Sequence, residues 1–241
     1  MKDELDLAAI IEKLRWLRLP GMARGLDKLI ERARTDNLTP IQIVDALAEE
    51  EKNSRIKSAV ERRIRGARFA EINTVDGFDF AWDVTRKKVR ARYLALHDLG
   101  FIDHAVCPIF VGTPGTGKTF LARALAYRAC QATRNVLFTS AARMLNDLAG
   151  GDVHGNVTRV LRKYTRPALL VIDDFAVLEM DTAQAKLAFQ VISERYDYRR
   201  STAITSNQGE CESSSRKCAR TDAARYRCAG VARARAVATR A

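Results

Sequence analysis

The sequence predicts an α/β protein, a parallel β-sheet with flanking helices that is preceded by a small all-helical domain. Three observations predict it. Residues 112–119 have the pattern of a phosphate-binding loop, which joins a strand to a helix. From about residue 100 apolar strand segments alternate with helical segments, whereas residues 7–68 keep helical spacing. The expected domains are a helical domain (1–72), the sheet domain (73–209) and a basic, disordered tail (210–241).

Three helices are expected in the first domain. The apolar residues of the first share one face and end before Pro20-Gly21: Leu7, Ile10, Ile11, Leu14 and Leu17. A second apolar stripe follows: Met22, Leu26, Leu29, Ile30 and Ala33. The third helix starts with Thr39 as its cap and Pro40 as its first residue. We expect its residues Ile41, Val44 and Leu47 to face inward.

Two basic runs, residues 52–68 and 86–92, contribute to a net charge of +12 and a pI near 9.8. Such a balance indicates a polyanionic partner, nucleic acid first and acidic lipid second. A basic run can equally be the solvated face of a helix, and the sequence leaves both interpretations open. Before the second run, Phe78, Phe80 and Trp82 are predicted to lead into the sheet domain.

The compartment follows from what the sequence lacks. Residues 1–5 are polar and acidic, unlike a secretory leader, and no apolar run reaches transmembrane length. The five cysteines are odd in number and show no C-x-x-C spacing. We therefore expect a reduced, cytoplasmic protein that does not contact a membrane.

The phosphate-binding loop predicts ATP and Mg²⁺ as ligands. All of its residues are expected to contact the nucleotide: Gly112, Thr113, Pro114, Gly115, Thr116, Gly117, Lys118 and Thr119. Backbone N–H groups at the start of the next helix would point at the phosphates. Lys118 would reach the β- and γ-phosphates, and the Thr119 hydroxyl would hold Mg²⁺.

Three further strands are expected at 135–139, 168–172 and 201–206, with helices at 141–149, 157–165 and 182–198. The strand at 168–172 is followed by Asp173, which is placed to hold Mg²⁺, and by Asp174, which is placed to orient the attacking water. Asn207 follows the strand at 201–206, where it can touch the γ-phosphate and its water. An acidic strand end that only faces solvent is the alternative.

Six segments together form a more specific pattern: Leu17–Ala23, Phe78–Phe80, Gly112–Thr119, Val136–Thr139, Leu170–Phe175 and Thr205–Asn207. In these segments the chain, to about residue 209, resembles the IstB family, the helper ATPases of one class of bacterial insertion sequences. The DnaC-type helicase loaders are close relatives of that family within the AAA+ P-loop ATPases. The Leu-Pro-Gly-Met segment with the Phe-Asp-Phe segment narrows the resemblance to IstB.

The resemblance implies a DNA-binding ATPase that assembles on duplex DNA as a homo-oligomer and cooperates with the transposase of the same element. It implies a nucleotide at a subunit boundary that an arginine from the neighbouring subunit completes. Arg195, Arg199 and Arg200 are available for such a role, and no motif selects one of them. A DnaC-like helicase loader in DNA replication and a nucleotide-binding remnant without hydrolysis remain as alternatives.

The pattern changes at Gly209. Residues 210–241 contain no Leu, Ile, Phe, Met or Trp, but nine Ala and eight Lys or Arg. Such a segment buries too little apolar area to offset the ordering of the chain. A shifted reading frame and a basic DNA-binding tail both explain it, and the abrupt compositional change favours the former. We expect this segment to supply no strand, to leave strand 107–111 as a sheet edge, and to impair ATP hydrolysis.

Overall fold

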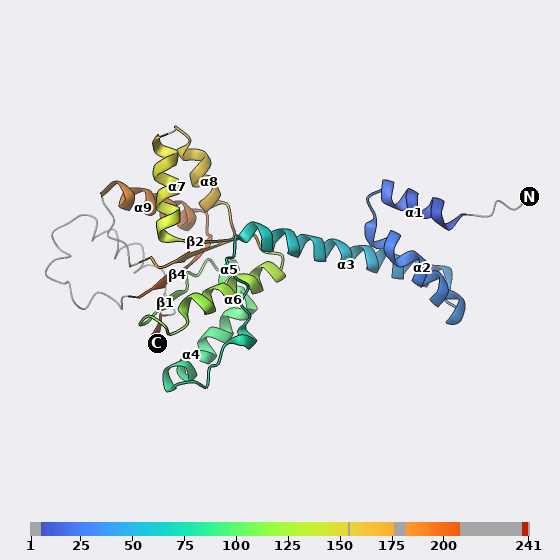
Figure 1. Ribbon diagram of the computed structural model, residues 1–241, viewed down its shortest axis with the longest axis horizontal. Coiled ribbons are helices and arrows are strands. Elements are labelled where there is room, and N and C mark those ends of the chain that lie inside the picture. The colour runs from blue at the N-terminus through green and yellow to red at the C-terminus, as the bar shows by residue number, and fades with distance from the viewer. Residues whose placement is uncertain (1–5, 154, 176–181, 208–237, 241) are drawn as a thin grey trace, which may run out of the picture. The chain divides into compact units, whose positions relative to one another are not determined.

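The computed structural model describes residues 6–153, 155–175, 182–207 and 238–240 (Figure 1). The chain divides into two compact units, Met1–Arg62 and Arg63–Ala241. The first unit contains α1 (Leu7–Trp16), α2 (Pro20–Thr35) and most of α3 (Pro40–Ala67). The division falls within α3, so one continuous helix connects the two units.

Helix α3 begins with a capping box. The Thr39 N–H donates to Gln42 Oε1 at 2.8 Å, and the Gln42 N–H donates to Thr39 Oγ1 at 3.4 Å. These reciprocal bonds satisfy two backbone donors that have no partner inside the helix. Pro40 occupies the first helical position, where its missing N–H costs nothing. The predicted start of this helix is confirmed.

Helix α2 has no side-chain cap of its own, and a carboxylate of α3 takes that place. Glu51 Oε2 accepts from the backbone N–H of Gly21 at 2.7 Å and of Met22 at 3.3 Å. A Cβ on Gly21 would lie 2.6 Å from the Glu50 carbonyl oxygen, so only glycine permits this close approach of the two helices. The structure explains two residues of the Leu-Pro-Gly-Met segment. Pro20 starts α2, and Gly21 allows α2 to approach α3 closely.

Burial by itself would raise the pKa of Glu51. Hydrogen bonds from Arg55 and from the backbone of Gly21 and Met22 outweigh burial, and the pKa lies below its usual value of 4.5. The stability that this carboxylate contributes is therefore fully present above pH 4.5. It is lost as the pH falls through the lower folded-state pKa.

Replacing Glu51 by alanine is expected to destabilise the start of α2 by about 1–2 kcal/mol, because two backbone donors lose their acceptor. Amide hydrogen exchange of the first turn of α2 in the full chain measures this. The exposed Glu49, whose carboxylate pairs with Lys52, provides the control Glu49→Ala. Equal protection in both variants at neutral pH would contradict the assigned cap.

The prediction that Ile41 and Val44 face inward is wrong. Their exposed fractions are 81% and 67%. The contacts between α2 and α3 involve Gly21, Gly25 and Arg24 against residues 50–54 of α3. Ile41 and Val44 lie at least six residues, more than one turn, before that crossing, so α2 does not cover them.

The second unit is built around a sheet of five strands: β1 (Ile109–Val111), β2 (Val136–Ser140), β3 (Leu169–Asp173), β4 (Ser201–Ser206) and β5 (Ala238–Arg240). Its helices are η1 (Val75–Gly77), α4 (Val84–Leu94), η2 (Ala95–Asp98), α5 (Gly100–Asp103), α6 (Lys118–Gln131), α7 (Ala141–Val153), α8 (Val157–Thr165) and α9 (Thr182–Asp197). All strand pairs are parallel, in the order β2-β3-β4-β1-β5. The predicted parallel α/β fold is confirmed.

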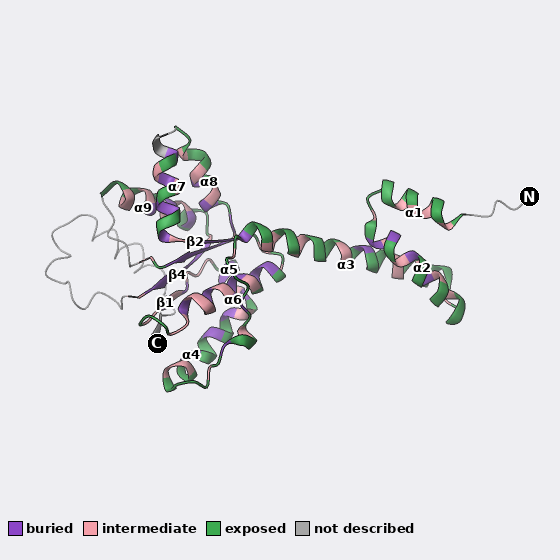
Figure 2. Cartoon of the chain, viewed as in Figure 1, coloured by how far each residue is buried: buried purple, intermediate pink, exposed green. Residues whose placement is uncertain are grey.

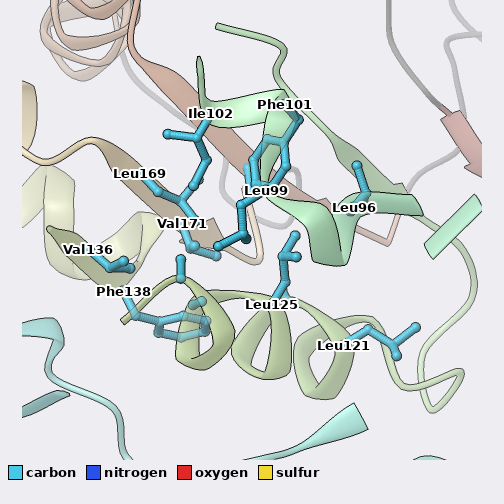
Figure 3. Close-up of a cluster of buried hydrophobic side chains, with 14 of the residues drawn as sticks. Leu96, Leu99, Phe101, Ile102, Leu121, Leu125, Val136, Phe138, Leu169 and Val171 are labelled. Carbon is cyan, nitrogen blue, oxygen red and sulfur yellow. The ribbon is translucent and has the colours of Figure 1, made fainter. Parts of the chain in front are cut away.

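Two apolar layers cover the two faces of the sheet, and β3 shows how its residues alternate between them. Leu169 and Val171 point to one face, where Leu121 and Leu125 of α6 pack (Figure 3). Leu170 and Ile172 belong to the cluster with α7, α8 and α9 on the other face. A strand buried on both sides needs a continuous apolar run, which is why the strands appear buried in Figure 2.

The expectation that β1 forms a sheet edge is wrong. Residues 238–240 run parallel to β1, with Ala238 opposite Ile109 and Arg240 opposite Val111. Strand pairing uses backbone N–H and C=O groups, so a short edge strand can form without an apolar side-chain pattern. The prediction of a disordered tail otherwise falls on residues 210–237 and 241, which lie outside the described part of the chain. No described helix is long and apolar enough to cross a bilayer.

Candidate nucleotide-binding site

The predicted phosphate-binding loop lies between β1 and α6. Gly115 and Gly117 have φ values of +83° and +92°, the left-handed region in which glycine has no steric cost. Gly117 is the residue that precedes α6, and a Cβ at this position would overlap the ring of Phe78. The glycines therefore set both the turn and the packing of the loop against the Phe-Asp-Phe segment.

Lys118 is held inside this loop with an exposed fraction of 8%. Its Nζ donates to the Thr113 carbonyl oxygen at 2.8 Å, and Thr116 Oγ1 donates to the same carbonyl at 2.9 Å. Burial lowers the pKa of Lys118, while the negative charges of Asp174 and Asp173 act in the opposite direction. The ammonium group is thus partly desolvated, and the charges of both predicted carboxylates favour its protonated form.

Thr119 and Asp173 are brought together from elements that are far apart in the sequence. Thr119 Oγ1, in the first turn of α6, donates to Asp173 Oδ1 at the end of β3 at 2.9 Å. Asp173 is buried, with an exposed fraction of 6%. A hydroxyl and a carboxylate side by side supply the hard oxygen ligands that Mg²⁺ takes, so this donor set fits the metal. Both residues would hold Mg²⁺ beside the phosphates.

Sequence reasoning missed the role of Thr205. Its side chain is fully buried, and its Oγ1 donates to Asp173 Oδ1 at 2.6 Å and accepts from the Asp174 N–H at 2.9 Å. The hydroxyl therefore ties the end of β4 to the end of β3 and orients both carboxylate residues. A threonine two positions before Asn207 is the available sequence signal, but only the pairing of β3 with β4 brings it to Asp173.

Asp174 and Asn207 follow β3 and β4 directly, at the same edge of the sheet as the loop. Asp174 has a φ of +55° and an exposed side chain. Partial burial and the neighbouring Asp173 raise the pKa of its carboxyl, and the charges of Lys118 and Arg123 partly offset this. Asn207 is half-buried. Their roles toward a water remain predictions.

An aromatic hollow adjoins the loop. Phe78, Tyr93 and Phe110 line it together with Lys118 and Arg86. The Arg86 guanidinium lies 4.8 Å from the centroid of the Phe78 ring. Arg86 begins the second basic run, yet its guanidinium lines this hollow and makes a cation–π contact there.

The three arginines considered for a neighbouring site differ in the structure. Arg195 is fully buried and bonded to backbone carbonyls, so it cannot reach another subunit, and the expectation that it is available is wrong. Arg200 donates to the Thr165 carbonyl and lies over the Tyr198 ring. Arg199 is exposed.

The fold has known counterparts. Domain III of the Thermotoga maritima replication initiation protein DnaA matches 58% of this chain and 59% of its own, with a TM-score of 0.51 and 21% identity. A replication initiator DnaA bound to AMPPCP and single-stranded DNA matches 56% of this chain and 41% of its own, with a TM-score of 0.50 and 20% identity. The chain thus spans less than two thirds of either structure. The likeness concerns the AAA+ P-loop fold alone.

Sequence relatives are more specific. An ATP-binding protein in an insertion sequence of Mycobacterium tuberculosis is 34% identical over 200 residues, which cover 83% of this chain and 79% of the relative. An insertion-sequence ATP-binding protein of Geobacillus stearothermophilus is 31% identical over 192 residues, covering 80% and 75%. Residues 12–215 match the family described as IstB-like ATP binding protein. The phosphate-binding loop and the Leu-Pro-Gly-Met segment both lie within that match, and the chain belongs to the family of IstB-like ATP-binding proteins.

Proposed function

We propose that this chain is an ATP-binding, DNA-associated helper of transposition, which acts in the cytoplasm as a homo-oligomer on duplex DNA. Its partner in this proposal is the transposase of the same element. The observation that carries the proposal is the hydrogen bond between Thr119 and Asp173 beside the loop that holds Lys118, within a chain of the IstB-like family.

The site residues divide the work of holding the nucleotide. Backbone N–H groups of the loop and the Lys118 ammonium would bind the phosphates, while Thr119 and Asp173 would hold Mg²⁺. Bound Mg²⁺ neutralises the charge that develops on the phosphate oxygens. Asp174 and Asn207 are the candidates for orienting the attacking water.

The basic runs supply the contacts that duplex DNA would need. Lys57, Arg62 and Arg65 of the first run are exposed, and so are Lys87, Lys88 and Arg90 of the second. Neutralising backbone phosphates releases counterions, and this makes binding salt-dependent without sequence preference. A merely solvated helix face would not show this dependence.

Fluorescence anisotropy of a labelled duplex of random sequence tests the DNA part in the full chain with Mg²⁺ and ATP. We expect the affinity to fall with salt, by a log–log slope of about −0.9 for each phosphate contacted. The variant Lys57→Ala/Arg62→Ala/Arg65→Ala should reduce that slope. Binding without salt dependence would mean that the basic runs are only solvated faces.

The choice of partner separates the proposed function from a helicase loader. In the presence of ATP and duplex DNA, the chain is expected to retain the transposase of its own element on the DNA. A replicative helicase should not be retained under the same conditions. Retention of the helicase alone would favour the loader.

A further inference from the structure

A hollow of about 510 Å³ lies beside α8, away from the nucleotide site. Basic side chains line it at positions i, i+3, i+4 and i+7 of that helix: Arg159, Arg162, Lys163 and Arg166. Residues at these spacings share one face of an α-helix. Thr158 and Asn156 line the same hollow at the start of α8 and add polar side chains.

Three of the four cations have no ion pair with a described residue. Lys163 donates to Asp147 of α7, which also accepts from Tyr164 Oη at 2.6 Å. No described carboxylate pairs with the exposed Arg159, Arg162 or Arg166. The Lys163 contact therefore connects α8 to α7. The N–H donors of the three exposed guanidinium groups are accessible to a ligand in solvent.

The opposite face of α8 explains why these arginines point outward. Leu161 and Tyr164 are buried in the apolar cluster that α8 forms with α7, α9 and the sheet. Helices α7, α8 and α9 lie together beside the sheet in Figure 1. With Leu161 and Tyr164 covered, the exposed charged side chains on this side of the chain are Arg159, Arg162 and the following Arg166.

We propose that the basic face of α8, formed by Arg159, Arg162 and Arg166, is a contact surface for the sugar-phosphate backbone of duplex DNA. This inference rests on the proposed function and names a surface that lies outside both basic runs. Guanidinium groups suit this ligand because their planar donors bind phosphate oxygens in pairs.

The geometry favours an extended polyanion over a small anion. Arg159 and Arg166 are seven residues apart, about 10 Å along the helix axis. That distance corresponds to about three nucleotides of one DNA strand, at about 3.4 Å each. The cations thus form a row long enough to face several phosphates of a duplex, and none of the described residues that line the hollow is a buried charged side chain that would enclose a single anion.

A membrane surface fits less well. Helices that lie on bilayers insert an apolar face below the headgroups. In α8 that face is already used for packing, since Leu161 and Tyr164 have exposed fractions of 6% and 0%. Electrostatic attraction alone would remain, so DNA is the partner that the surface fits.

The test compares the full chain with the variant Arg159→Ala/Arg162→Ala/Arg166→Ala in the salt titration of duplex binding. Removing three phosphate contacts should reduce the magnitude of the log–log slope by up to about 2.7 and weaken binding to duplexes of any sequence. The variant Lys28→Ala/Arg34→Ala/Lys186→Ala removes the same charge from exposed positions elsewhere and should keep the slope nearly unchanged. Replacing the three arginines by lysine should preserve most of the slope, because the charges remain.

Each outcome is decisive. Unchanged thermal unfolding and ATP-analogue binding in the alanine variant show that the fold and the nucleotide site are intact. A wild-type chain that binds duplex normally, with an alanine variant of equal slope, overturns the inference and leaves the proposed function standing. Absence of salt-dependent duplex binding in the wild type would contradict both the inference about α8 and the DNA-binding part of the proposed function. Loss of binding to anionic vesicles or to inorganic phosphate in the alanine variant, with duplex binding unchanged, would also overturn the inference.

Discussion

Replacing Lys118 by alanine is expected to abolish measurable binding of a fluorescent ATP analogue, a loss of at least about a hundredfold, or ~2.7 kcal/mol. The ammonium group carries the positive charge of the loop, and it is already partly desolvated. Without it, the phosphates would face Asp173 and Asp174 without the positive charge of the loop itself. Titration of the analogue into the full chain with Mg²⁺ measures the effect.

The control for this experiment is Lys186→Ala, which removes the same charge from an exposed position on α9. Its affinity for the analogue should equal that of the wild type. Circular dichroism should show that both variants keep their secondary structure. Retained micromolar affinity in Lys118→Ala would contradict the assignment of the loop as the nucleotide site.

Replacing Arg195 by alanine is expected to cost about 3–5 kcal/mol of the free energy of unfolding. The guanidinium is fully buried and donates to the carbonyls of Tyr164 and Pro167, each at 2.9 Å, and to Thr202 Oγ1 at 2.8 Å. Burial lowers the pKa of Arg195 to about 9, so it remains protonated at neutral pH. Its loss would leave several buried acceptors without donors and a cavity between α9 and β4.

Urea-induced unfolding of the full chain measures this cost. A single domain has about 5–15 kcal/mol of total stability, so Arg195→Ala should unfold at much lower urea or fail to accumulate as folded protein. Arg195→Lys supplies three donors instead of five and should be intermediate. The exposed neighbour Arg199→Ala should change stability by less than about 0.5 kcal/mol. An unchanged midpoint in Arg195→Ala would show that these bonds contribute nothing.

The strands and helices of the second unit follow from local patterns. The predicted strands at 168–172 and 201–206 correspond to β3 and β4, and the predicted helices at 157–165 and 182–198 to α8 and α9. Continuous apolar runs of strand length, separated by amphipathic segments, predict a parallel sheet that helices cover on both faces. The turn of the loop also follows from local sequence, since glycine adopts the positive φ values found at Gly115 and Gly117 without steric cost.

Positions whose environment depends on the distant chain were predicted less well. Ile41 and Val44 have helical apolar spacing but remain exposed, because the covering helix crosses α3 further along. Arg195 has the chemistry of a catalytic arginine, yet the carbonyls of residues 164–168 surround it. The strand at 238–240 has no apolar sequence pattern, yet it pairs with β1 in the parallel sheet.

The sequence by itself determined the fold class, the loop at 112–119 and the membership of the chain in its family, because these depend on residue type and spacing along the chain. Only the tertiary structure decided which side chains meet. Thr119, Asp173 and Thr205 are far apart in the sequence. The pairing of β3 with β4 beside α6 brings the two threonine hydroxyls to 2.9 and 2.6 Å from Asp173 Oδ1. Glu51 and Gly21 come together in the same way, through the crossing of two helices. The physical reason is that a hydrogen bond depends on distance in space, which a linear pattern of residues does not specify.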